Sequence, residues 1–141
     1  MSVEENKALI RRMYELFNKR ELDKYDEVFG PGYVEHYPGM DLSLEQVLKG
    51  GPAWLAAFPD VVSEIEDMIS EGDKVAYRVT HRGTHNGPYM GVAATGNRIE
   101  MTNTCIIRMA GGKCAECWAT MDNLRLMQQI GAIPSGPPKK G

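Results

Sequence analysis

Two kinds of hydrophobic spacing divide the chain. In the first third, apolar residues recur every three or four positions, as they do from Leu9 to Phe17. This period predicts an amphipathic helix over residues 3–19. From Val62 onward, β-branched and aromatic residues alternate with polar ones, which predicts strands. Helices followed by a strand meander indicate an α+β fold, with the helices on one face of a curved antiparallel sheet.

Polar, glycine and proline residues mark the ends of the expected elements. Ser2 with Glu5 and Ser43 with Gln46 have the spacing of capping boxes, which begin helices. The glycines and proline at 50–52 should kink or split the second of these helices. The other expected elements are a short helix at 22–29, a brief strand at 33–37, strands at 62–70, 74–83, 98–109 and 113–121, and a last helix capped by Asp122.

Two segments should lack regular structure. The stretch 84–96 holds three glycines and a proline, and we expect a long irregular excursion of the kind that often borders a site. The end of the chain, 134–141, is rich in proline, glycine and lysine and should form a mobile tail. One domain is therefore expected over 1–133, with 134–141 as its tail.

Alternation along the last two strands separates an inner from an outer sheet face, provided that no bulge intervenes. Small side chains on the inner face, such as Ala119, leave volume for either a ligand cavity or a closely docked helix. Asn103 is the polar exception there and is either a hydrogen-bonded core residue or a ligand contact. The residues predicted to line a pocket are Tyr77, Met101, Asn103, Cys105, Cys117, Ala119 and Met121.

The outer face is too apolar for a sheet that faces water alone. It carries Ile106 and Trp118 among several threonines. Apolar side chains on an otherwise polar face indicate a half-covered interface. We therefore expect a homodimer, or a dimer of dimers, formed through this face.

The net charge and the cysteines limit which partners and which cellular compartment are expected. The net charge is −3, which leaves no broad basic face for nucleic acid or an anionic membrane. The acidic start of the chain does not resemble a signal peptide, and no window is long and apolar enough to span a membrane. The three cysteines cannot all pair within the chain, in keeping with a reducing compartment. A cytoplasmic protein with a small-molecule or protein partner is expected.

The residues that could bind a metal or carry redox chemistry are poorly spaced for either. Cys114 and Cys117 form C-x-x-C, but on a strand these positions point to opposite faces. The histidines at 36, 81 and 85 lack metal-site spacing, so neither a metal nor a cofactor is expected. His81 has the parity of a packed strand residue, whereas His36 and His85 are the candidates for acid–base groups at the mouth of the pocket.

Seven short motifs, taken in their order and spacing, resemble the SnoaL-like polyketide cyclase family. They are F-P-D at 58–60, E-G-D-K-V at 71–75, G-T-H-N-G at 83–87, T-G at 95–96, R-M-A-G-G-K at 108–113, E-C-W at 116–118 and Q-I-G at 129–131. The resemblance covers nearly the whole chain. It implies the nuclear transport factor 2-like fold, a cone made of a bent sheet and about three helices.

The resemblance also implies a chemistry whose key groups are missing here. Cyclases of this family close a ring by intramolecular aldol condensation without a cofactor, using an aspartate base helped by a histidine. Those two positions fall at Ala119 and Cys105, and Asp122, which matches a second acidic position, is assigned as a helix cap. His85 lies in the family's G-T-H motif, and His36 in a Y-x-x-H-x-P stretch found in relatives outside the true cyclases.

Three functions remain open from the sequence. The first is a cofactor-independent isomerase, cyclase or lyase acting on a small apolar or aromatic carbonyl compound. Its base would be His36 or His85, and Asn103 or Tyr77 would orient an oxygen. The second is a non-catalytic binder of an apolar small molecule, and the third is an oligomerising interaction module.

Overall fold

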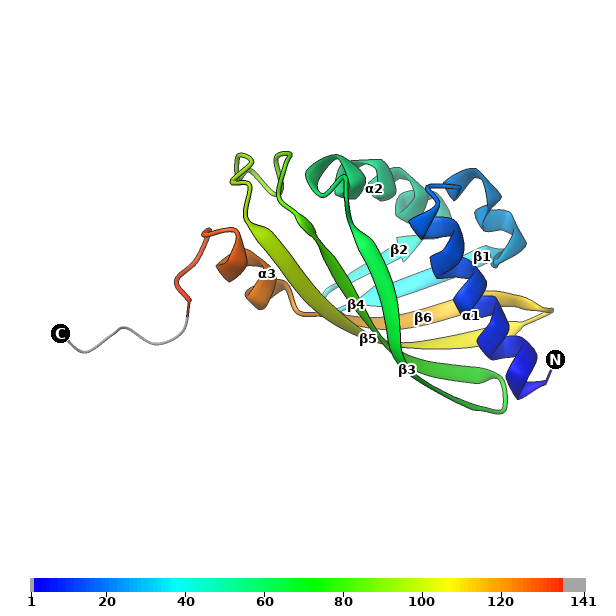
Figure 1. The fold of residues 1–141 in the computed structure, drawn as a ribbon. Coiled ribbons are helices and arrows are strands. Elements are labelled where there is room, and N and C mark those ends of the chain that lie inside the picture. The colour runs from blue at the N-terminus through cyan, green and yellow to red at the C-terminus, as the bar shows by residue number, and fades with distance from the viewer. Residues whose placement is uncertain (1, 136–141) are drawn as a thin grey trace.

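The strand-forming part of the chain builds one curved six-stranded sheet with helices on its concave face (Figure 1). The structure is a computed structural model that describes residues 2–135. Its strands are β1 (Phe29–Tyr37), β2 (Met40–Ser43), β3 (Val62–Glu71), β4 (Lys74–Thr84), β5 (Arg98–Ala110) and β6 (Lys113–Met121). Its helices are α1 (Val3–Asn18), the 3₁₀ helix η1 (Leu22–Glu27), α2 (Leu44–Ala57) and α3 (Asn123–Gln129). The α+β prediction is confirmed.

Both predicted capping boxes begin helices. The hydroxyl of Ser2 accepts from the Glu5 amide at the start of α1, and Ser43 accepts from the Gln46 amide at the start of α2. The expected split of α2 is wrong, because the helix continues through Pro52. Proline has no N–H and so removes one hydrogen bond of the helix. The helix nevertheless continues, because Val47 before the proline and Trp54 after it both pack on the core.

The sheet is a meander extended by two further strands. Strands β3 to β6 pair in sequence order, as predicted. The segment expected as a brief strand starts earlier, at Phe29, and β1 pairs in parallel with β6 and antiparallel with β2. This parallel pairing could not be read from local signals, since parallel partners are joined by long connections. It brings β1 to the wall of the concave face (Figure 1).

A β-bulge in β6 changes which side chains face the core. Glu116 lies opposite Arg108 and Cys114 opposite Met109, so Ala115 is the extra residue. Cys114 and Cys117 are consequently both buried on the inner side, and the predicted opposite orientation is wrong. All three cysteines are free thiols in the core.

The C-terminal segment covers one end of the sheet. Asp122 caps α3 by accepting from the Arg125 amide at 3.1 Å, which confirms the assignment of this residue as a cap. Leu126 and Ile130 pack with Phe58 and Ile99 in a second core cluster. Residues 136–141 of the predicted tail lie outside the described part. None of the helices within 2–135 has the length and apolarity needed to cross a membrane.

Candidate functional site

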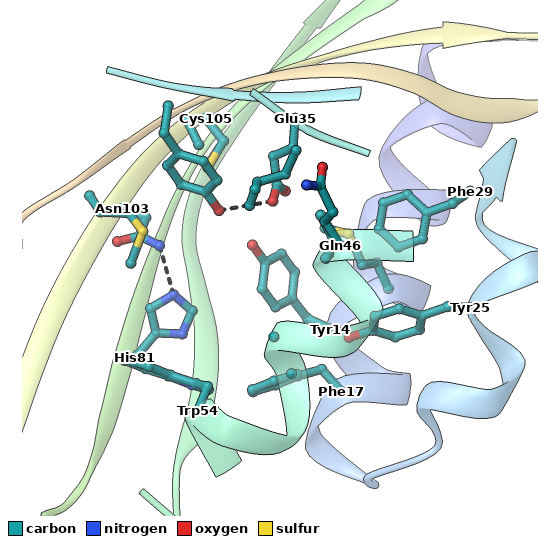
Figure 2. Close-up of a pocket in the computed structure, with 18 of the residues that line it drawn as sticks. Tyr14, Phe17, Tyr25, Phe29, Glu35, Gln46, Trp54, His81, Asn103 and Cys105 are labelled. Carbon is teal, nitrogen blue, oxygen red and sulfur yellow. Dashed lines mark hydrogen bonds between the residues drawn. The ribbon is translucent and has the colours of Figure 1, made fainter. Parts of the chain in front are cut away.

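A cavity of about 290 Å³ lies between the concave face of the sheet and helices α1 and α2. Helical spacing turns Tyr14 and Phe17 of α1 toward it, and strand alternation presents every second residue of β4 and β5. Figure 2 shows aromatic rings on most of its sides, with a few polar groups between them. Its lining comprises Met13, Tyr14, Phe17, Tyr25, Phe29, Glu35, Tyr37, Leu42, Gln46, Val47, Gly50, Gly51, Trp54, Tyr77, His81, Met101, Asn103, Cys105, Ala119 and Met121.

Glu35 supplies the only carboxylate in this lining. It lies in β1 in register with Cys117, which places it on the inner face of the sheet. The hydroxyls of Tyr33 and Tyr37 each donate to one of its oxygens at 2.9 Å. Burial raises the pKa of Glu35, and the two tyrosine hydrogen bonds oppose that rise. A carboxylate has about four acceptor positions, so Glu35 keeps acceptor capacity toward the cavity.

Two tyrosine hydroxyls of the lining meet each other. Tyr14 of α1 and Tyr77 of β4 lie with their oxygens 3.0 Å apart, and their rings pack edge to face. Burial raises the pKa of both phenols well above the usual value, which keeps both protonated at neutral pH. In Figure 2 the Tyr14 hydroxyl points into the cavity, on the side where Glu35 projects.

His81 is held in the cavity as a neutral ring. Its Nδ1 lies 2.6 Å from the Ser63 hydroxyl, and the Asn103 amide donates to Nε2 at 3.1 Å (Figure 2). Burial lowers the pKa of His81 to about 4. Both ring nitrogens are engaged, so this histidine positions Asn103 rather than offering a free basic nitrogen.

All but one of the predicted pocket residues line the cavity. Tyr77, Met101, Asn103, Cys105, Ala119 and Met121 are in the lining, and Cys117 is not. Cys117 is buried in the main core cluster with Tyr33 and Cys105. Strand parity therefore matches the sheet wall of the cavity at the other six positions.

His36 does not lie at the cavity mouth. It is one residue beyond Glu35, so strand alternation turns it to the outer face, where it stacks on Trp118 with ring centroids 5.6 Å apart. Its nitrogens each lie 2.7 Å from a carboxylate oxygen, of Asp41 and of Glu116. These two hydrogen bonds raise the pKa of His36, which makes it an ion-pair partner rather than a free base.

His85 is also away from the cavity. Its side chain is 0% exposed and packs against Phe58 at the start of the 85–97 excursion. Its Nδ1 lies 2.9 Å from the Thr95 hydroxyl, and its backbone exchanges hydrogen bonds with Asn97 and Gly96. These hydrogen bonds hold the two ends of the excursion together at His85.

The polar residues of the cavity that sequence reasoning missed were signalled by strand alternation. Glu35 and Tyr37 of the lining alternate along one strand with Tyr33, which lies in the core, and His81 shares the parity of Tyr77. Applying parity to the short first strand would have turned Glu35 inward and His36 outward. Tyr14 and Trp54 carried no such signal, because their approach to the sheet depends on how the helices dock.

The described residues do not supply a set of side chains that could bind a metal ion. Within residues 2–135, no three His, Cys, Asp or Glu side chains are grouped so as to hold a metal ion. What the arrangement offers is a single carboxylate of raised pKa, neutral hydroxyl and amide donors, and aromatic walls. These groups suit proton transfer on an uncharged, hydrophobic molecule.

Comparison with known proteins identifies relatives of this chain. The chain is 28% identical over 130 residues to the aklanonic acid methyl ester cyclase DnrD of Streptomyces peucetius, covering 87% of this chain and 88% of the relative. Among solved structures, AclR from Streptomyces galilaeus superposes with a TM-score of 0.89 at 31% identity, covering 96% of this chain and 87% of AclR. IdmH from Streptomyces antibioticus gives a TM-score of 0.80 at 32% identity, covering 89% and 98%.

The family model agrees with these relatives. It is the model of the SnoaL-like polyketide cyclases, and it matches residues 7–130, from the first turns of α1 to the end of α3. That span includes every residue of the cavity lining. The chain belongs to the SnoaL-like polyketide cyclase family, with the curved sheet and helices of the nuclear transport factor 2-like fold.

Proposed function

We propose that this protein is a cofactor-independent cyclase, isomerase or lyase that removes a proton next to the carbonyl of a hydrophobic small molecule. The observation that carries the proposal is the single carboxylate, Glu35, held by two tyrosines in an aromatic cavity. The family membership and the cyclase DnrD among the relatives support the same class of reaction. The cavity would be the active site, and Glu35 the base.

The chemistry follows from the charge of the cavity. The Glu35 carboxylate takes a proton from the carbon beside the carbonyl, and the electrons of that C–H bond form the enolate. In a cyclase, the enolate carbon then attacks a second carbonyl of the same molecule, and the alkoxide formed there takes up the proton that Glu35 removed. In an isomerase, the proton returns from Glu35 to another carbon. A carboxylate with a raised pKa is a stronger base than an ordinary one, which suits proton abstraction from carbon.

In this chain, Ala119 and Cys105 occupy the positions of the family's aspartate and histidine. Glu35, at a different position, would therefore supply the missing base. Ala119 lies on β6, the strand that pairs with β1, and Ala119 and Glu35 line the same cavity. A base on β1 would approach the ligand from a neighbouring strand rather than from β6. Variants of His36 and His85 provide the complementary test, and turnover unchanged in His36→Ala and His85→Ala would remove both histidines from the reaction.

Proton exchange on a model ketone tests the proposal. α-Tetralone, a hydrophobic aromatic ketone, should exchange its α-hydrogens for deuterium faster in the presence of the protein, as followed by NMR. Glu35→Gln should lower this acceleration by about 10²- to 10⁴-fold. The rate should rise with pH as Glu35 ionises, with a midpoint above the ordinary 4.5.

The matched control is Glu116→Gln, which alters a carboxylate on the outer face, where it contacts His36 and Arg108. It should leave exchange unchanged. No acceleration by the wild type, or equal rates in the wild type and Glu35→Gln, would contradict the proposal. The same assay with aklanonic acid methyl ester, the compound for which the relative DnrD is named, would show whether this chain also acts on it.

The second candidate is a non-catalytic binder of an apolar molecule, favoured by Ala119 and Cys105 at the two reacting positions of the cyclases. Aromatic walls alone would provide the affinity in that case. A binder would be stabilised against thermal unfolding by α-tetralone and would not accelerate exchange.

A further inference from the structure

The Tyr14–Tyr77 pair has a hydrogen-bonding capacity that the fold does not use. Two hydroxyls 3.0 Å apart need one hydrogen between them, and the second hydrogen remains. The Tyr77 hydroxyl also interacts with the Cys105 thiol, whereas within residues 2–135 the Tyr14 hydroxyl has no side-chain hydrogen-bond partner other than Tyr77. Both residues line the cavity, so the remaining hydrogen is available to a ligand. A buried polar hydrogen without a partner is costly unless something binds there.

The strength of that donor depends on its neighbour. A hydroxyl that accepts a hydrogen bond becomes a better donor through polarisation, particularly in a poorly solvated site. Tyr77 is 4% exposed on β4, where its ring packs edge to face on Tyr14. The Tyr14 hydroxyl points into the cavity (Figure 2). Tyr77 is thus placed to donate to Tyr14, and Tyr14 to the ligand.

The lining supplies no cation to receive negative charge. It contains neither lysine nor arginine, and its one histidine is neutral because burial lowers its pKa to about 4. If negative charge develops on a ligand oxygen, only hydroxyl and amide donors can stabilise it. Preorganised neutral donors in a poorly solvated site are effective at this task, because they need no reorganisation as the charge forms.

We propose that Tyr14 and Tyr77 form an oxyanion site that stabilises the enolate oxygen of the ligand. Tyr14 is the catalytic residue that touches the oxygen, and Tyr77 positions it and strengthens its donor. This inference rests on the proposed function, since the enolate is made by Glu35. When Glu35 takes the proton it becomes neutral, and the electron pair of the broken C–H bond resides on the oxygen facing Tyr14.

Binding of a stable enolate mimic tests the site without any turnover. The probe is α-naphthol, which in its ionised form has the shape and charge of the α-tetralone enolate. Glu35→Gln reproduces the neutral base, so this variant should bind the naphtholate more tightly than the wild type does. Fluorescence titration, which distinguishes naphthol from naphtholate, gives the affinity at each pH.

In the Glu35→Gln background, Tyr14→Phe should weaken naphtholate binding by about 10- to 100-fold, as expected for loss of a hydrogen bond to a charge. Tyr77→Phe should weaken it by less, since the Tyr14 hydroxyl remains. Affinity for uncharged naphthalene should be unchanged in both. Tyr89→Phe, at a partly buried tyrosine outside the cavity lining, is the matched control and should change neither affinity.

Equal naphtholate affinity with and without the Tyr14 hydroxyl would overturn the oxyanion site. An equal loss for naphthalene would also overturn it, because that result indicates a packing role. Either outcome leaves the deuterium-exchange test of Glu35 standing. Conversely, Tyr14→Phe could weaken naphtholate binding as predicted while the wild type accelerates no deuterium exchange. That result would support an oxyanion-binding pocket and contradict the proposed function.

Discussion

At the scale of single residues, the cavity combines one charged group with several neutral hydrogen-bonding groups. Glu35 and His81 are both removed from water, and the effect on each pKa has the expected opposite sign. Burial disfavours the charged form, so it raises the pKa of the acid and lowers that of the base. The site therefore combines a carboxyl group whose pKa is raised with an imidazole that is neutral at neutral pH.

The depressed pKa of His81 predicts a loss of stability in acid. The unfolded chain binds the histidine proton below about 6.5 and the folded protein only below about 4, so stability is full above the first value and falls as the pH drops toward the second. The loss should reach about 3 kcal/mol in the free energy of unfolding at the acid end. Urea unfolding at a series of pH values measures it.

His81→Gln provides the comparison, because glutamine keeps hydrogen-bonding capacity and does not titrate. This variant should lose stability less steeply than the wild type over the same pH window. Parallel curves for the two proteins would show that His81 is not the titrating group. The bonds to Ser63 and Asn103 make some loss of stability at neutral pH expected for the variant.

Much of the sheet side of the cavity could be predicted residue by residue. Parity placed Met101, Asn103 and Cys105 on one face, since regular antiparallel pairing fixes which side chains share a face. The helix side could not be predicted in the same way. Amphipathic spacing shows which face of α1 is buried, but whether Tyr14 meets Tyr77 is decided by the docking angle of the helix.

At the scale of elements, the long excursion between β4 and β5 is attached to the end of α2. The amides of Asn86 and Gly87 both donate to the carbonyl of Ala57. Gly87 lies so close to the helix that an added Cβ would stand 2.1 Å from the Ala56 carbonyl oxygen. Only glycine allows this approach, which the sequence signalled merely as a glycine-rich stretch.

Gly87→Ala should therefore destabilise the protein, by about 1–3 kcal/mol, because either the excursion or the end of α2 must move. Gly50→Ala is the matched substitution, since Gly50 lies within α2 with nothing within 4 Å of the added Cβ. Alanine should stabilise that helix by about 0.5–1 kcal/mol. Thermal unfolding that ranks Gly87→Ala as the more stable variant would contradict the packing described.

Errors in predicting the elements came from features with no local signal. A bulge at Ala115 shifts parity within β6, and the sequence around it does not differ from a regular strand. The parallel partnership of β1 with β6 joins segments about eighty residues apart, which only the tertiary fold decides. Capping boxes and turn glycines, by contrast, act over three or four residues and located the elements well.

At the scale of the whole molecule, the two faces of the sheet have different roles. The concave face, with α1 and α2, encloses the cavity, and the opposite face is open. That outer face bears the exposed side chains of Ile106 and Trp118, at 43% and 41%, among charged and threonine residues. His36 stacks on Trp118, and the Lys74 ammonium lies 5.8 Å from the centre of its ring.

A homodimer through the outer face remains our prediction. Sedimentation at micromolar concentration should give a dimer, and Trp118→Glu should shift it to a monomer by placing a charge in the interface. Thr120→Glu on the same strand face tests whether the effect is specific to the indole. A wild-type protein that sediments as a monomer throughout would contradict the prediction.

For the molecule as a whole, we propose that the aromatic cavity holds a carbonyl ligand between Glu35 and the tyrosine pair. A crystal structure of the protein with α-tetralone tests it most directly. We predict the ketone oxygen within hydrogen-bond distance of the Tyr14 hydroxyl, and the neighbouring carbon about 3–3.5 Å from a Glu35 oxygen. A ligand bound outside the cavity, or inside it with its carbonyl turned away from both groups, would contradict the account.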